Sequence, residues 1–145
     1  MSGLSLTQLV IELVRRLKGV EPNASVKASI YEVVESNGLE KYDDVPSWLI
    51  KFFRSIIDGQ STEKVYIYEE ESQKSEADVW NFLAELENIL GIESDDYGEG
   101  IEMVFKPLGI YAFISLESGF YRIQSAKDTQ CTSYAAKKLS DSSSS

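Results

Sequence analysis

The hydrophobic periodicity changes near residue 60, and this change constrains the fold more than any other feature. Before it, three segments repeat apolar residues every three or four positions. After "GQST", the pattern changes to period two in four strand-type runs, and one further helix-type segment follows the first run. A period of 3.6 is typical of helices and a period of two of strands. The order predicts an α+β fold, with three N-terminal helices followed by strand-helix-strand-strand-strand, and an antiparallel sheet with helices on one face.

Local signals set the element boundaries. Ser5 followed by Gln8 predicts a capping box for a helix from Leu6 to Lys18. Asn23 predicts the cap of a second helix that ends at Ser36. The other helix segments are "PSWLIKFFRSIIDG" and "EADVWNFLAELENILG", and the strands are "KVYIYEE", "GIEMVFK", "GIYAFISL" and "GFYRIQS". We expect a single globular domain over 1–125 and a polar tail over 126–145, with its last residues disordered.

Alternation also predicts which side of the sheet meets solvent. The meander places Glu102, Tyr111 and Arg122 at positions that alternate with apolar residues. An antiparallel sheet often has one face on the core and one face in water. We therefore expect these three side chains on an exposed face.

The third helix carries more apolar surface than one packed face requires. Its seven apolar residues span roughly 200°, whereas a stripe of about 100° is enough for one-sided packing. A central core helix, an interface helix and a membrane-surface helix with Lys51 and Arg54 on its polar side are three interpretations. Excess apolar arc favours a homodimer, built on the strand edge "GFYRIQS" or on Trp48, Phe52, Phe53 and Ile56.

Composition excludes several classes of function. The chain has no histidine and one cysteine, Cys131, so no Ser–His or Cys–His pair exists. It contains no "GxxxxGK" or "GxGxxG" phosphate loop. A net charge of −10 disfavours nucleic acid and anionic membranes as partners. We expect a non-catalytic protein without a cofactor, and a lone cysteine with no signal-peptide pattern points to the cytoplasm.

The segment Glu93 to Val104, "ESDDYGEGIEMV", invites a comparison with calcium loops. With Gly98 at the glycine position of an EF-hand, Tyr97 takes position five and Gly100 takes position eight. Val104 then stands at position twelve, where a bidentate glutamate belongs. The alignment fails at three positions, so we expect no metal site and interpret the segment as an acidic loop between helix and strand.

Negative charge is concentrated in the middle of the chain. The segment from Glu63 to Glu102 contains thirteen Asp and Glu residues but only two Lys. Such a block is a solubilising surface, a docking face for a partner with a basic surface, or an imitation of a phosphate row. The residues proposed to bind the partner are Glu69, Glu70, Glu71, Glu76, Asp95, Asp96 and Glu99.

These observations predict a small acidic binding or regulatory protein that docks another macromolecule through residues 63–102. The alternative is an inhibitor or immunity-type protein that blocks a nucleic-acid-binding enzyme by charge mimicry. A third hypothesis comes from the order of a helix, a glycine stop, an acidic turn and a three-stranded meander over Glu76 to Gln124. This order is similar to that of small acidic secretion-chaperone-like folds, a resemblance that implies a protein-binding role.

Overall fold

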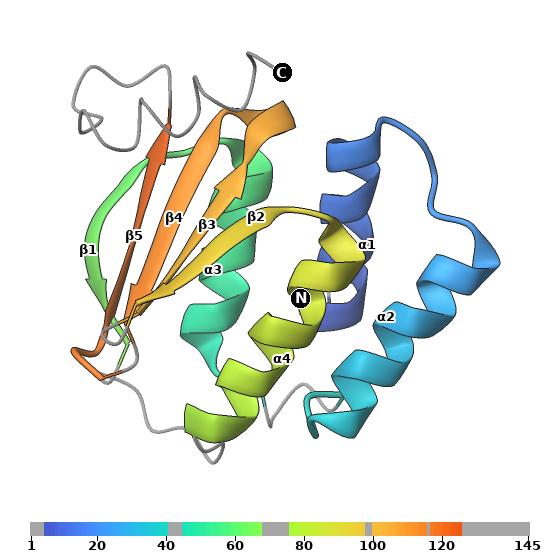
Figure 1. Ribbon diagram of the computed structural model, residues 1–145, viewed down its shortest axis with the longest axis horizontal. Helices are drawn as coiled ribbons and strands as arrows, with labels where there is room; N and C mark the ends of the chain where they lie inside the picture. The colour runs from blue at the N-terminus through green and yellow to red at the C-terminus, as the bar shows by residue number, and fades with distance from the viewer. Residues whose placement is uncertain (1–4, 41–44, 68–75, 98–99, 116, 126–145) are drawn as a thin grey trace. The chain divides into compact units, whose positions relative to one another are not determined.

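The computed structural model describes residues 5–40, 45–67, 76–97, 100–115 and 117–125, with the backbone alone for 76–77 and 93–97. Backbone contacts divide the chain into two compact units. The helical unit comprises residues 1–54 and 70–91, and the sheet unit comprises residues 55–69 and 92–145. The elements of both units are drawn in Figure 1. The expectation of a single domain over 1–125 stays a prediction.

The helical unit contains α1 (Leu6–Lys18), α2 (Ala24–Ser36), α4 (Glu76–Leu90) and most of α3 (Ser47–Asp58). The predicted capping box is present at α1, where Ser5 and Gln8 each accept a hydrogen bond from the other's backbone N–H. Asn23 caps α2 by accepting from the backbone N–H of Val26. Both caps satisfy N–H groups that have no partner within the helix. The sequence-predicted helices are therefore confirmed.

The core of the helical unit is built from the predicted apolar stripes. Helix α2 packs against both α1 and α4, and these helices are seen in Figure 1. Leu13 of α1 and Leu86 of α4 have no exposed surface. Phe53 of α3 meets Phe82 of α4 edge to face, with ring centroids 6.3 Å apart. Edge-to-face rings contribute about 0.5–1.5 kcal/mol beyond the area that they bury, so this contact stabilises the α3–α4 packing.

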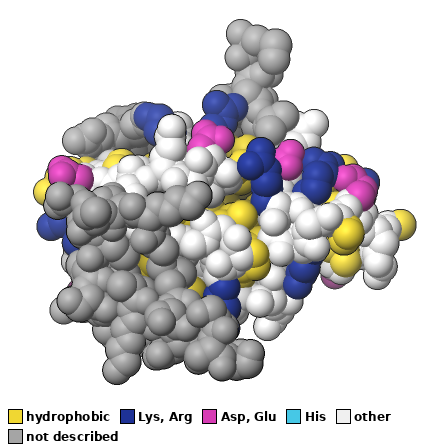
Figure 2. All heavy atoms as spheres, turned by 90° about the horizontal axis from the view of Figure 1, so that it is seen from above, with side chains coloured by type: hydrophobic (Ala, Val, Ile, Leu, Met, Phe, Trp, Pro, Cys, Tyr) yellow, Lys and Arg dark blue, Asp and Glu magenta, His cyan; other side chains and the backbone are white. Residues whose placement is uncertain are grey.

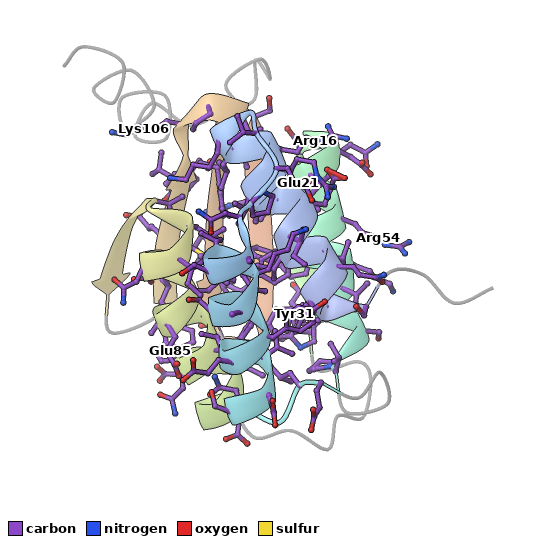
Figure 3. All side chains as sticks on the ribbon, turned by 90° about the vertical axis from the view of Figure 1, so that its right-hand side faces the viewer. Arg16, Glu21, Tyr31, Arg54, Glu85 and Lys106 are labelled. Carbon is purple, nitrogen blue, oxygen red and sulfur yellow. The ribbon has the colours of Figure 1, made fainter. Side chains whose placement is uncertain are left out.

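An ion cluster ties the connection between α1 and α2 to both helices. Arg15 donates hydrogen bonds to Glu12 and to Glu21, at 3.0 Å in each case from a terminal guanidinium nitrogen. Lys27 of α2 lies 3.0 Å from the same Glu21 carboxylate. Hydrogen bonds from Arg15, and then from Lys27, lower the pKa of Glu21 to about 2. Figure 3 shows Glu21 at the end of the unit where α1 is joined to α2.

Glu21 makes this connection sensitive to acid. Its pKa is depressed in the folded chain from 4.5 to about 2, so the unfolded chain binds the proton more tightly. The stabilising contribution is complete above pH 4.5 and is lost as the pH falls towards 2. We expect the stability difference between the wild type and Glu21→Gln to disappear over this range in urea unfolding series at stepped pH. Glu32→Gln, at an exposed position on α2, is the control and should show no such window.

The sheet unit contains an antiparallel sheet with the strand order β1-β5-β4-β3-β2. Its strands are β1 (Thr62–Tyr66), β2 (Glu93–Tyr97), β3 (Gly100–Phe105), β4 (Ile110–Ser115) and β5 (Phe120–Ser125), with a short 3-10 turn, η2 (Lys106–Leu108), before β4. The α+β class and the antiparallel meander are confirmed. The expected acidic loop after α4 is wrong, because β2 occupies it and pairs with β3. Figure 1 shows β1 and β2 at the two edges.

The central strands have two buried faces. The apolar face carries Met103, Ala112 and Ile123, each with no exposed surface. The opposite face, which we call the mixed face, carries residues of both kinds, namely Glu102, Val104, Tyr111, Phe113, Arg122 and Gln124. The predicted solvent exposure of this face is wrong. Glu102 is 3% exposed, Tyr111 is 6% exposed and Arg122 is half-buried.

Gly100 allows a close approach at the start of β3. A Cβ at this position would overlap the carbonyl oxygen of Ile114 and would lie 2.7 Å from a ring carbon of Phe113. The backbone oxygen belongs to the paired strand β4 and has little room to move. Only glycine fits here without a shift of the strand pair.

Gly100→Ala should therefore destabilise the protein. Overpacking of a fitted site costs about 1–3 kcal/mol, and we expect a loss near the upper end because a strand backbone must move. Chemical denaturation followed by circular dichroism measures the change. Gly19→Asn is the control, because Gly19 has open space around it and a φ of +72° that asparagine tolerates. A loss at Gly100 no larger than at Gly19 would contradict the close approach.

Candidate functional site

The structure places three of the seven predicted partner-binding residues. Glu69, Glu70, Glu71 and Glu99 lie outside the described residues. Glu76 is the first residue of α4 in the helical unit. Asp95 and Asp96 are consecutive residues of β2 in the sheet unit, and they pair in register with Glu102 and Ile101 of β3. The structure thus brings two of the predicted carboxylates onto one edge strand.

The described strand residues of the acidic block lie at both edges of the sheet. Glu63 lies on β1, at the edge of the sheet opposite to Asp95 and Asp96. Four interstrand spacings separate these edges, which is about 19 Å. Glu102, at the end of the block, is buried. On the face in Figure 2, the drawn acidic and basic side chains are interspersed. A partner docked at Asp95 and Asp96 would therefore not meet Glu63 or Glu102 on the same edge.

The predicted dimer interface is buried within one chain. Trp48 is 8% exposed, and Phe52, Phe53 and Ile56 have no exposed surface. Side chains already packed in this way offer no area to a second copy. The other suggested interface is wrong, because "GFYRIQS" is β5 and lies between β1 and β4 rather than at an edge. The central-core interpretation of α3 fits this burial, and a homodimer stays a prediction.

A buried carboxylate lies on the mixed face of the sheet. Glu102 of β3 accepts a hydrogen bond from the phenol O–H of Tyr111 on β4. Tyr111 also packs with Val104 and with the partly buried ring of Phe113. A buried carboxylate needs such donors because removal of its hydration is costly. This pair supplies a polar link in an otherwise apolar region, and period-two spacing alone did not distinguish it from an exposed pair.

Tyr111→Phe removes this donor and keeps the ring. Hydrogen bonds to charged groups contribute about 1.5–3 kcal/mol, so we expect a decrease of that size in the free energy of unfolding at pH 7. Urea denaturation measures it. Tyr66→Phe, at a tyrosine that is 56% exposed, is the matched control and should change stability by less than about 0.5 kcal/mol. Equal effects of the two substitutions would show that the Tyr111 hydroxyl does not stabilise the fold.

A pocket of about 470 Å³ lies at the pairing of β1 with β5. The register shifts between Thr62 and Val65, so one extra residue of β1 is accommodated there. Such bulges re-aim side chains and are frequent beside functional sites. The pocket is lined by the apolar Ile123 and by two cations, one carboxylate, one amide and two hydroxyls, from Lys64, Arg122, Glu63, Gln124, Ser61 and Thr62. It belongs entirely to the sheet unit.

Two residues that line this pocket each carry a buried polar atom without a hydrogen-bond partner. These atoms are Nε of Arg122 and Oε1 of Gln124, which occupy alternate positions on the mixed face. Lys64 Nζ lies 4.6 Å from the centroid of the Phe120 ring on the same face. The sequence did not reveal this site, because it depends on the β1–β5 pairing across about sixty residues. The alternation of polar and apolar residues in "YRIQ" was the available signal.

Within the described ranges, no three His, Cys, Asp or Glu side chains are grouped so as to hold a metal ion. None of the helices in that part of the chain has the length and apolar content needed to cross a bilayer.

Comparison with protein-family models, with curated proteins and with solved structures finds no match to this chain.

Proposed function

We propose that this chain is a small non-catalytic binding protein that docks a basic, extended segment of another protein along strand β2. The observation that supports the proposal is the position of an acidic strand at the edge of the sheet. β2 has the sequence "ESDDY", and β3 is its neighbour at the end of the strand order. Among the described residues no further strand pairs with its outer side.

An edge strand offers a row of backbone donors and acceptors to an incoming strand. Backbone hydrogen bonds then provide affinity, and cross-strand pairs provide selectivity. Each opposite-charge pair across strands contributes about 0.2–1 kcal/mol, so lysine or arginine on the partner is favoured opposite Glu93, Asp95 and Asp96. The overall charge of −10 also accelerates the encounter with a basic partner.

Pairing of β2 with a second copy of itself is disfavoured by the same charges. An antiparallel β2–β2 pair brings the carboxylates of one strand opposite those of the other, and like charges across strands are destabilising. The acidic edge thus selects a basic partner over self-association. A homodimer has no support from this edge, from β5 or from the buried face of α3.

Charge mimicry of nucleic acid is less well supported. A mimic requires carboxylates that follow the spacing of a phosphate row, whereas Glu63 and β2 lie at opposite edges of the sheet. Glu102 is buried and cannot contribute to such a row. A cytoplasmic location remains part of the proposal, because a lone cysteine suits a reducing compartment.

The test uses a synthetic peptide of alternating lysine and valine and the full ¹⁵N-labelled chain. We expect saturable chemical-shift changes that centre on the amides of β2, and an association rate about tenfold lower in Asp95→Asn/Asp96→Asn, as expected for lost electrostatic steering. Glu32→Gln/Glu35→Gln removes the same charge from exposed positions on α2 and should slow association far less.

Two results would contradict the proposal. Equal slowing by the two double variants would show that net charge, rather than the edge strand, attracts the peptide. Shifts that centre away from β2 would place the docking surface elsewhere. A strand added to β2 should also slow hydrogen exchange of the β2 amides, whereas attraction by charge alone leaves their exchange unchanged.

A further inference from the structure

We propose that the pocket at the β1–β5 edge binds a small monocarboxylate that also carries a hydrogen-bond donor, such as an amide N–H. This site is separate from the proposed docking strand, since β1 and β2 are opposite edges of the sheet. Its volume of about 470 Å³ lies within the range of about 300–1,000 Å³ that is usual for small-molecule sites.

The strongest evidence is the unsatisfied guanidinium nitrogen of Arg122. Its Nε–H is buried and has no hydrogen-bond partner, and a buried donor left unpaired costs free energy. Arginine presents its donors as a planar fork that matches the two oxygens of a carboxylate. A bound carboxylate would satisfy Nε and bring a negative charge to the cation. No described carboxylate forms a salt bridge with Arg122 in the folded chain.

The second unsatisfied atom, Gln124 Oε1, indicates that the ligand also carries a hydrogen-bond donor. Gln124 Oε1 is an acceptor, and Gln124 lies two residues along β5 from Arg122, so the Cα atoms of the two residues are about 7 Å apart. Chloride or sulfate has no donor to offer this oxygen. A ligand that carries both a carboxylate and an N–H satisfies both atoms at once.

The bulge in β1 adds further donors around the carboxylate position. Lys64 Nζ is held over the Phe120 ring, on the mixed face that also carries Arg122. The hydroxyl oxygens of Thr62 and Ser61 accept from the backbone N–H groups of Ile123 and Ser125. Each hydroxyl keeps its own hydrogen for donation. Two cations and two hydroxyl donors therefore line one small volume in a chain of net charge −10.

Glu63 limits the charge of the ligand. Its exposed carboxylate also lines the pocket, where it opposes the two cations and repels a second negative charge. A phosphate dianion is thus less favoured than a monocarboxylate. The N–H group of the ligand is compatible with Glu63, because the Glu63 carboxylate can accept a hydrogen bond from it.

The test is a titration of the full ¹⁵N-labelled chain with N-acetylglycine, which has one carboxylate and one amide N–H. We expect a saturable shift of the backbone amides of residues 62–64 and 122–124, with a Kd of about 1 mM, as is reasonable for so small a ligand. Acetate lacks the donor and should bind several-fold more weakly. The methyl ester of N-acetylglycine lacks the charge and should not bind, and inorganic phosphate should be weaker than N-acetylglycine.

Single substitutions test which residues of the pocket contact N-acetylglycine. Arg122→Gln should weaken N-acetylglycine at least about tenfold, the effect of a lost charge-assisted pair. Arg54→Gln removes the same charge from an exposed position on α3, seen pointing outward in Figure 3, and should leave the Kd unchanged within about twofold. Gln124→Leu should abolish the preference for N-acetylglycine over acetate. A dispersed spectrum confirms that each variant is folded.

Three outcomes would overturn the proposal. They are the absence of saturable shifts at these amides up to about fifty times the expected Kd, equal Kd values for Arg122→Gln and the wild type, and tighter binding of inorganic phosphate than of N-acetylglycine. Because none of these measurements involves β2, a failed peptide-docking experiment leaves this proposal unaffected, and the reverse also holds.

Discussion

The antiparallel register of β3, β4 and β5 determines where the polar groups of the sheet unit lie. Met103, Ala112 and Ile123 stand in one row across these strands and are fully buried on the apolar face. A shift of one residue would exchange this row for the neighbouring one, which contains Glu102 and Arg122. The close approach of Gly100 to Ile114 opposes such a shift, because any larger residue entering that position would meet backbone.

Fixed register also explains how a carboxylate and a guanidinium are tolerated on a buried face. The carboxylate of Glu102 accepts a hydrogen bond from the Tyr111 hydroxyl on the adjacent strand. Arg122 occupies the same row two strands away, with Phe113 between them, and its Nε has no partner. One polar group is thus satisfied within the sheet and the other is not. A buried donor without a partner in the fold is a position where a water molecule or a ligand can accept a hydrogen bond.

Periodicity predicted the fold well because local sequence dominates helix and meander formation. The bounds of α1 and α2 follow from Ser5, Gly19 and Asn23, whose capping roles are local. β2 escaped prediction because aspartate is depleted in strands, and "ESDDY" becomes a strand by pairing with β3. The burial of the mixed face escaped prediction for a related reason. Alternation of residue types places Glu102 and Tyr111 on one side of the sheet, but it carries no information on whether that side meets solvent.

The two candidate sites could be predicted from the sequence to different degrees. The excess of acidic residues was visible in composition, but sequence distance is a poor guide to which of them are neighbours. Glu63 and Asp95 are separated by the width of the sheet, and Lys64 and Arg122 line one pocket although they lie far apart in the chain. Strand pairing, rather than local propensity, determined which charged residues are neighbours.

Strand order also sets how strongly the two edges influence each other. The pocket between β1 and β5 and the acidic strand β2 are separated by three to four interstrand spacings, roughly 14–19 Å. The Debye length is about 8 Å at physiological ionic strength and about 30 Å at 0.01 M. Charges at one edge are therefore largely screened from the other under physiological conditions, so a carboxylate in the pocket would change binding at β2 very little. At low salt the screening length exceeds the separation. Neutralisation of Arg122 and Lys64 by an anion would then weaken their repulsion of a basic segment at β2, and the two sites would become weakly cooperative through charge alone.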